Sequence, residues 1–155
     1  MGKSPRELVG YCGIFCGACG IYQGRIKEAV ENLRKVIGAY GFDKIGPELA
    51  KWNPAFKNYA EFEQVLDGFI KLFSECPGCV VGGGNPDCVI RPCCSQKKYA
   101  TCIECVEMDT CEKLLREVGS LENLKRIKAA GVDKWAKEMQ KKVDAGYCML
   151  DEIVK

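Results

Sequence analysis

Hydrophobic positions in the first half of the chain predict two amphipathic helices. From Ile21 to Ala39, apolar side chains recur every three or four positions, with charged side chains between them. A second helix is predicted after Asn58, which forms a capping-box pattern with Glu61. Its apolar stripe consists of Phe62, Val65, Leu66, Phe69, Ile70 and Phe73. We interpret this stripe as part of a hydrophobic core, with a groove for a partner as the alternative.

The last third of the chain predicts three more helices, and the segment before it is irregular. Apolar positions at helical spacing cover residues 109–118, 120–130 and 132–145, and a glycine follows each run. Residues 74–111 are rich in glycine and proline and lack periodicity, so we expect loops and turns there. A short helix is predicted near residues 92–99, and brief strands at 79–81 and 88–90.

These elements predict a mainly α fold, with a small α+β fold as the alternative. We expect a single domain spanning residues 1–155, because this length is typical of one domain. Within it, residues 74–111 form a cysteine-rich subregion that the cysteine knot at residues 11–20 closes. We expect bound metal to staple this glycine- and proline-rich region to the helices.

The cysteines carry the candidate chemistry. Eight of the twelve lie in residues 74–111 and three lie in residues 11–20. A C-x2-C turn directs two sulfurs to the same side and aims backbone N–H groups at them, which suits a metal ion. The predicted metal ligands are Cys12, Cys16, Cys19, Cys76, Cys79, Cys88, Cys93, Cys102, Cys105 and Cys111. The spacing predicts no ligand role for Cys94 and Cys148, which we interpret as spare thiols.

The spacing leaves the grouping of these ligands open. The C-x2-C pair at Cys76 pairs either with the one at Cys102 or with Cys88 and Cys93. The three cysteines of the N-terminal knot need a fourth ligand, for which Cys111 is the first choice, followed by Cys88 or Cys93. Arg91 is either a hydrogen-bond donor to metal thiolates or an ordinary surface arginine.

All-thiolate sites favour zinc, with two ions expected, and an iron–sulfur cluster is the alternative. The spacing of Cys12, Cys16 and Cys19 matches that of radical S-adenosylmethionine enzymes. The chain lacks the length and the strand–helix repeat of their barrel, and Ala18 stands where an aromatic residue is usual. We therefore expect a metal-binding protein that acts as a binding or regulatory module; a redox or electron-transfer protein is the alternative.

Charge and composition exclude several other functions. The formal charge is +2, and two four-thiolate sites with divalent ions would make it negative, so nucleic acid is not an expected partner; a protein partner stays open. No apolar run is long enough for a membrane helix, and clustered cysteines fit a reducing cytoplasm. The absence of histidine removes the commonest general base and no convincing acid pair replaces it, so a hydrolase is not the expected function. Gly82, Gly83 and Gly84 fail the dinucleotide pattern and are interpreted as a flexible turn.

Five cysteine motifs resemble a known family. They are YCGIFCGAC at residues 11–19, CPGC at 76–79, CVIRPC at 88–93, CIEC at 102–105 and CEKL at 111–114. In order and spacing they resemble the DUF3795 family of small cysteine-rich proteins of unknown function. The resemblance implies zinc binding at the shared positions. Gly131–Trp135 also has counterparts in that family, often followed by a C-x2-C pair, whereas here only Cys148 remains.

Overall fold

The computed structural model describes residues 3–115 and 119–154 of the chain, which fold into two compact units. One unit comprises Met1–Gln23 and Cys76–Lys155, and the other comprises Gly24–Glu75. The second unit is thus inserted between the two parts of the first, and all twelve cysteines belong to the first. The prediction of a mainly α fold is confirmed. Within the described residues, β pairing is limited to one isolated bridge, between Val9 and Phe15.

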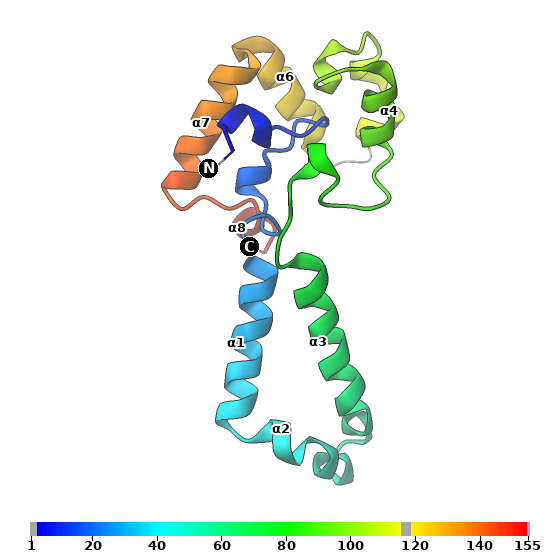
Figure 1. The fold of residues 1–155 in the computed structure, drawn as a ribbon, viewed down its shortest axis with the longest axis vertical. Coiled ribbons are helices and arrows are strands. Elements are labelled where there is room, and N and C mark those ends of the chain that lie inside the picture. The colour runs from blue at the N-terminus through cyan, green and yellow to red at the C-terminus, as the bar shows by residue number, and fades with distance from the viewer. Residues whose placement is uncertain (1–2, 116–118, 155) are drawn as a thin grey trace. The chain divides into compact units, whose positions relative to one another are not determined.

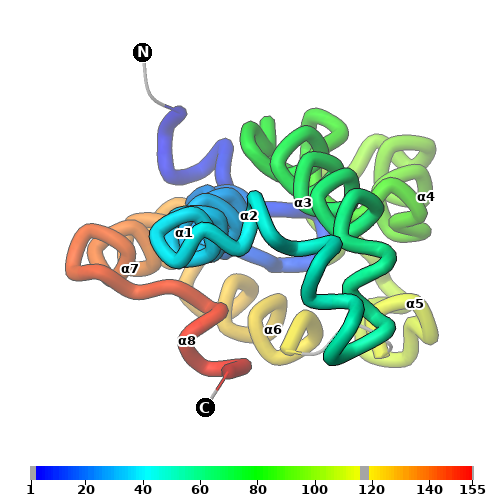
Figure 2. The backbone as a smooth tube through the Cα atoms, turned by 90° about the horizontal axis from the view of Figure 1, so that it is seen from below, coloured from blue at the N-terminus to red at the C-terminus, as the bar shows by residue number. Residues whose placement is uncertain are grey.

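The inserted unit is a helical hairpin (Figure 1). Helices α1 (Arg25–Ala39) and α3 (Tyr59–Phe73) form its arms, and α2 (Phe42–Ile45) begins the connection at its tip. Two 3-10 turns, Gly46–Lys51 and Pro54–Asn58, complete the connection. Figure 2 views the hairpin end-on and shows its two arms as separate coils joined through the tip. Arg34 on α1 links the arms, because its guanidinium lies 2.7 Å from Asp67 and 3.1 Å from Glu63 on α3.

The starts of both arms differ in detail from the sequence predictions. α1 begins at Arg25 and not at Ile21, because Gly24 adopts a left-handed conformation with φ +73° that cannot continue a helix. Asn58 does precede α3, but its side chain makes no capping hydrogen bond. A capping side chain needs extended backbone, whereas Asn58 is the last residue of the preceding 3-10 turn.

The apolar stripe of α3 is a helix face, as its spacing predicts, but much of it is not core. Leu66 is buried at 6% exposure. Phe62, Val65 and Phe69 keep 38%, 56% and 42% of their surface accessible. The interpretation of the whole stripe as core is therefore wrong for these three side chains, since a two-helix hairpin can cover only the side of each helix that faces the other.

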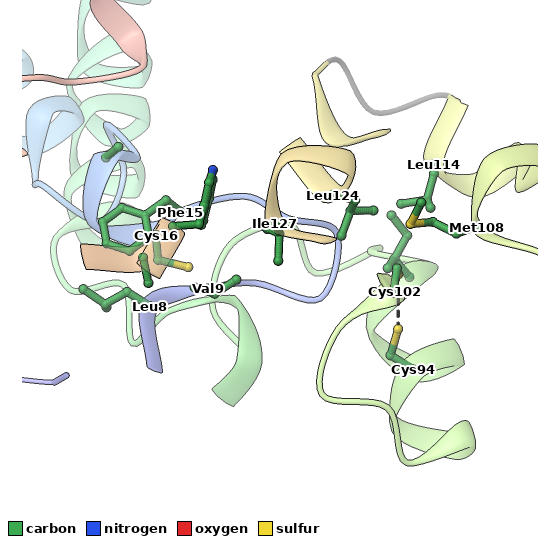
Figure 3. Close-up of a cluster of buried hydrophobic side chains, with 14 residues drawn as sticks. Leu8, Val9, Phe15, Cys16, Cys94, Cys102, Met108, Leu114, Leu124 and Ile127 are labelled. Atoms are coloured by element: carbon green, nitrogen blue, oxygen red, sulfur yellow. Dashed lines mark hydrogen bonds between the residues drawn. The ribbon is translucent and has the colours of Figure 1, made fainter. Parts of the chain in front are cut away.

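The cysteine-containing unit is built from short helices around an elongated core. Its helices are α4 (Ile90–Lys97), α5 (Glu112–Leu115), α6 (Ser120–Ala130), α7 (Val132–Asp144) and α8 (Leu150–Ile153). Figure 3 shows Leu8, Phe15 and Cys16 at one end of the buried cluster and Cys94, Cys102 and Met108 at the other. Leu124 and Ile127 of α6 lie between them, both fully buried. The core thus has two ends, each containing cysteine.

Several predicted elements of this unit are confirmed and others are corrected. α6 and α7 match the predicted ranges closely. The predicted strands are absent: Cys79–Val81 is a 3-10 turn, and Ile90 begins α4. Glycine with positive φ on both sides of the first segment, at Gly78 and Gly82, prevents it from extending. Of the helix predicted over 109–118, the structure contains α5, while residues 116–118 lie outside the described part.

Candidate functional site

The N-terminal cysteines lie on a tight turn at one end of the core. The bridge between Val9 and Phe15 closes a loop in which Gly13 has φ +82°. A side chain at Gly13 would also meet Leu124 at 3.0 Å, so the loop sits directly on α6. Cys16–Ala18 then forms a 3-10 turn in which the N–H of Cys19 donates to the carbonyl of Cys16 at 2.9 Å. This turn places the two cysteines of the C-x2-C pair on one compact corner.

Hydrogen bonds connect the C-terminal segment to this turn. The N–H of Met149 donates to the carbonyl of Ala18 at 2.8 Å. The side-chain amide of Gln23 donates to the carbonyls of Gly17 at 2.8 Å and Tyr147 at 3.1 Å. Cys148 is buried at 1% exposure and is part of this packing.

Cys79 lies beside Cys16. The backbone N–H of Cys79 donates to the sulfur of Cys16, with 3.3 Å between nitrogen and sulfur. Lys3 donates to the carbonyl of Pro77, which places an ammonium group next to the same turn. A C-x2-C turn far along the sequence therefore meets the N-terminal knot, and a backbone N–H points at a thiol as it does in metal–thiolate turns.

A hydrogen bond between the thiols of Cys16 and Cys79 shifts their pKa values in opposite directions. The pKa of Cys16 is lowered to about 6, chiefly by the hydrogen bond from the Cys79 thiol, with the Cys79 N–H and Lys3 adding to the effect. The pKa of Cys79 is raised, first by that hydrogen bond, then by burial and by the charges of Cys16, Cys12 and Cys19. Cys16 is therefore the more acidic thiol of the pair, and the remaining knot cysteines are close enough to affect Cys79.

The glycine loop at residues 82–84 packs against the Cys76–Cys79 turn. The N–H of Gly83 donates to the carbonyl of Gly78 at 2.9 Å. A Cβ at Gly83 would lie 2.8 Å from the sulfur of Cys76. Arg91 donates to the carbonyls of Gly82, Gly83 and Asn85. The second interpretation of Arg91, an ordinary surface side chain, is therefore wrong, and its observed acceptors are loop carbonyls.

The second group of cysteines lies at the other end of the core. Thr101 caps the 3-10 turn Cys102–Glu104, and the N–H of Cys105 donates to the carbonyl of Cys102 at 3.0 Å. This repeats the geometry of the Cys16 turn. The N–H of Cys102 also donates to the carbonyl of Tyr11 at 2.9 Å, which connects the second group to the N-terminal knot.

A small cavity of about 30 Å³ lies within this second group. That volume is about the space occupied by one water molecule. Five cysteines from three separate segments line it: Cys93, Cys94, Cys102, Cys105 and Cys111. The sulfurs of Cys94 and Cys102 are 3.3 Å apart. The pKa of each of these two thiols is raised, first by burial.

Lys97 provides positive charge at the second group. Its ammonium lies 3.8 Å from the sulfur of Cys105 and 3.8 Å from the carboxylate of Glu107. The pKa of Lys97 is raised, first by the charge of Cys105 and then, after an opposing effect of burial, by Cys93. Lys3 and Lys97 thus occupy equivalent roles at the two groups, each beside a cysteine. Neither lysine stands out in the sequence, because exposed lysines are common and only the fold brings these two to the thiols.

Predicted ligands are found at both ends of the core. Among residues 3–115 and 119–154, no group of three or more cysteine or carboxylate side chains is arranged so that it could hold a metal ion. Cys79, and not Cys111, lies beside Cys16, while Cys111 lines the cavity of the second group. Cys94 lines the same cavity although its spacing predicts no role. Cys88 is partly buried and packs against the core.

These features define a cysteine-rich, mainly α protein with two groups of cysteines in one compact unit. The profile of a family described as a protein of unknown function (DUF3795) matches residues 8–116, well over half of the chain. The chain belongs to that family. The matched range contains every cysteine except Cys148. No curated protein and no solved structure matches the chain, and no described helix is long and apolar enough to cross a membrane.

Proposed function

We propose that this chain is a cytoplasmic metal-binding protein whose thiolates hold two zinc ions. The observation that carries the proposal is the cavity at the second group, because five cysteines from separate segments meet around a space of about 30 Å³. Thiolate is the ligand type that zinc prefers in closed sites. Metal binding would bring the sulfurs together into sets of four ligands, because binding of the metal and ordering of its ligands are coupled.

The proposed ligand sets follow the two ends of the core. The first set is Cys12, Cys16, Cys19 and Cys79, and the second set is Cys93, Cys102, Cys105 and Cys111. Lys3 and Lys97 offset part of the negative charge that four thiolates and one divalent ion leave at each site. A four-thiolate site leaves zinc no open position for water, so its role is to hold the fold as a binding or regulatory module.

Elemental analysis of anaerobically purified protein tests the proposal. We expect two equivalents of zinc per chain and no visible absorbance. Zinc-free protein would overturn the proposal. Stoichiometric iron with acid-labile sulfide and a visible charge-transfer band would replace zinc with an iron–sulfur cluster, for which the same thiolates are suitable ligands.

Single substitutions separate the two sites. We expect Cys79→Ala and Cys105→Ala each to remove about one equivalent of zinc, because each takes one ligand from a different set. Cys148→Ala is the matched control: it also removes a partly or fully buried thiol, but one outside both sets, and it should keep both ions. Loss of both ions in Cys148→Ala would show that the metal content reflects general folding and not these ligands.

A further inference from the structure

Cys94 and Cys102 form a buried thiol pair within the second group of cysteines. Their sulfurs lie 3.3 Å apart, and the two residues are 3% and 7% exposed. Figure 3 shows them facing each other from separate segments, with Cys94 on α4 and Cys102 on the 3-10 turn that follows. A disulfide has a sulfur–sulfur distance of about 2.05 Å, so the two sulfurs need to approach by only about 1.3 Å.

The end of α4 brings the two cysteines together. Lys98 adopts a left-handed conformation with φ +57°, which ends the helix. The N–H of Lys98 donates to the carbonyl of Ser95 at 3.1 Å, and the N–H of Tyr99 donates to the carbonyl of Cys94 at 3.0 Å. These are the two hydrogen bonds of a Schellman motif, which ends a helix and redirects the chain. The chain therefore turns directly after Cys94 and returns with Cys102.

Cys102 is fixed by its own segment. Its N–H donates to the carbonyl of Tyr11 at 2.9 Å, and the side chain of Thr101 caps the 3-10 turn that Cys102 begins. The carboxylate of Glu104 accepts from the N–H of Ala100 at 2.8 Å. Hydrogen bonds to the backbone thus hold both segments that carry the pair.

The two thiols differ in their relation to the proposed metal sites. Cys102 belongs to the second ligand set, and four ligands complete a closed zinc site, so Cys94 has no place in it. A thiol outside the set therefore lies against a thiol inside it. The half-buried Cys93 and Cys105 line the same cavity of about 30 Å³ as the pair. The cavity thus extends from the buried pair toward side chains that are partly accessible.

We propose that Cys94 and Cys102 are a reversible oxidation site, at which peroxide joins the two thiols in a disulfide and removes Cys102 from the second ligand set. Hydrogen peroxide transfers one oxygen to a thiol, which gives a sulfenic acid and one water. The other thiol attacks that sulfur and displaces its hydroxyl group as a second water. The sulfurs lose two electrons and the peroxide gains them. Where Cys102 begins as a metal-bound thiolate, hydroxide is released in place of one water.

The disulfide requires only the thiol pair, whereas its effect on metal rests on the proposed zinc sites. The metal ligand is a thiolate, and a sulfur in a disulfide no longer has that form. Oxidation would leave the second set one ligand short and release its ion. The first set lies at the other end of the core and would keep its ion. The pair would thus make one of the two sites sensitive to oxidants.

Peptide mapping of the oxidised full chain tests the disulfide. The protein is treated with hydrogen peroxide, its remaining thiols are alkylated, and tryptic peptides are identified by mass spectrometry. Lys97 and Lys98 lie between the two cysteines, so trypsin separates them and only a disulfide keeps their peptides joined. We expect the link between Cys94 and Cys102 to form before any other and to disappear with dithiothreitol. Fragment spectra distinguish Cys94 from the neighbouring Cys93.

Cys94→Ala removes the thiol outside the ligand set, so it should abolish the link and keep the zinc content and helicity of the wild type. Cys148→Ala is the matched control, because it removes another buried thiol, and it should keep the link. A chromogenic chelator measures zinc released during oxidation. We expect the wild type to release about one equivalent, the content of one four-ligand site. The release should follow the formation of the link in time, and dithiothreitol should restore binding.

The two proposals fail in different ways. A wild-type protein that forms no link between Cys94 and Cys102, or forms another link first, would refute the oxidation site even if it holds two zinc ions. A linked protein that keeps both ions would refute the effect on metal. Protein purified without zinc would refute the metal proposal, while the link in that same protein still decides whether the thiol pair is an oxidation site.

Discussion

At the scale of single residues, Gly83 shows how tightly the cysteine turns are packed. Its backbone does not need a positive φ, so a larger residue fails only for lack of space. A Cβ there would lie 2.9 Å from the nitrogen and 3.0 Å from the oxygen of Gly78, in addition to its contact with the sulfur of Cys76. Backbone atoms cannot move aside as the end of a flexible side chain can, so the Cys76–Cys79 turn itself would have to shift.

We therefore expect Gly83→Ala to destabilise the protein by about 1–3 kcal/mol, the usual cost of overpacking. Gly68→Ala is the control, because a Cβ at Gly68 on α3 meets nothing within 4 Å. It should stabilise α3 by about 0.5–1 kcal/mol through helix propensity. Urea unfolding followed by circular dichroism measures both. A Gly83→Ala variant as stable as the wild type would contradict the packing described around Cys76.

Positive charge beside the thiols is also a residue-scale feature that depends on the fold. Lys3 reaches the Cys79 turn across more than seventy positions of sequence, by donating to Pro77. Lys97 reaches Cys105 from the end of α4. The motif spacing selects the cysteines that are candidate ligands, but it contains no information on which of the many lysines would lie near them.

At the scale of elements, α7 is the support for the N-terminal cysteine turn. Trp135 of α7 is buried at 5% exposure and meets Phe15 edge-to-face, with 6.0 Å between ring centroids and 84° between planes. Phe15 directly precedes Cys16, so this aromatic contact positions the turn that presents the knot cysteines. Arg6 of the 3-10 turn Pro5–Leu8 and Asp133 of α7 lie 2.9 Å apart at the surface, but this ion pair is too exposed to contribute much.

The two tryptophans of the chain provide a direct comparison of buried and exposed positions. We expect Trp135→Ala to cost about 3–5 kcal/mol, as truncation of a large buried aromatic side chain does. Trp52, which is 87% exposed, should tolerate the same change within about 0.5 kcal/mol. Thermal and urea unfolding of the two variants measure the difference. Equal, small effects would show that α7 is not packed on Phe15 as described.

The elements also show what periodicity can and cannot predict. α3, α6 and α7 are found where their apolar spacing predicts them, because a 3.6-residue period is a property of the segment itself. Whether an apolar helix face is buried depends on what packs against it, and periodicity does not contain that information. For this reason the sequence predicts core positions at Phe62, Val65 and Phe69, whereas the hairpin leaves them exposed. Short 3-10 turns, as at Cys79–Val81, have no period to detect.

In the candidate site too, contacts within one turn can be predicted from the sequence, whereas contacts between distant segments cannot. The pairing of Cys102 with Cys105 within one turn follows from their spacing, and the structure shows that turn. The meeting of Cys79 with Cys16 does not, because the inserted hairpin removes any relation between sequence distance and spatial distance. Cys94 was likewise assigned no role by its spacing, since its approach to Cys102 depends on how α4 packs.

At the scale of the whole molecule, the cysteines and the exposed apolar face belong to different units. The cysteine-containing unit has short helices and a narrow core, of which Phe15, Leu114, Leu124, Ile127 and Cys148 are the largest fully buried side chains. Such a small core provides little stabilisation for the loops that carry eight cysteines. The hairpin has no cysteine and depends on the packing between α1 and α3.

This division predicts that metal removal acts on one unit. With a strong chelator, we expect amide hydrogens in residues 3–23 and 76–115 to lose protection against exchange, because metal–thiolate bonds would no longer fix their turns. Amide hydrogens in α1 and α3 should exchange at unchanged rates, since no ligand lies between Gly24 and Glu75. Peptide-resolved mass spectrometry measures both regions in one experiment, and added zinc should restore the original pattern.

Equal loss of protection in both units would mean that the metal-bound cysteines stabilise the hairpin as well. Unchanged protection around Cys16 and Cys102 would mean that the core holds these turns without metal, and the proposed structural role of zinc would then be wrong.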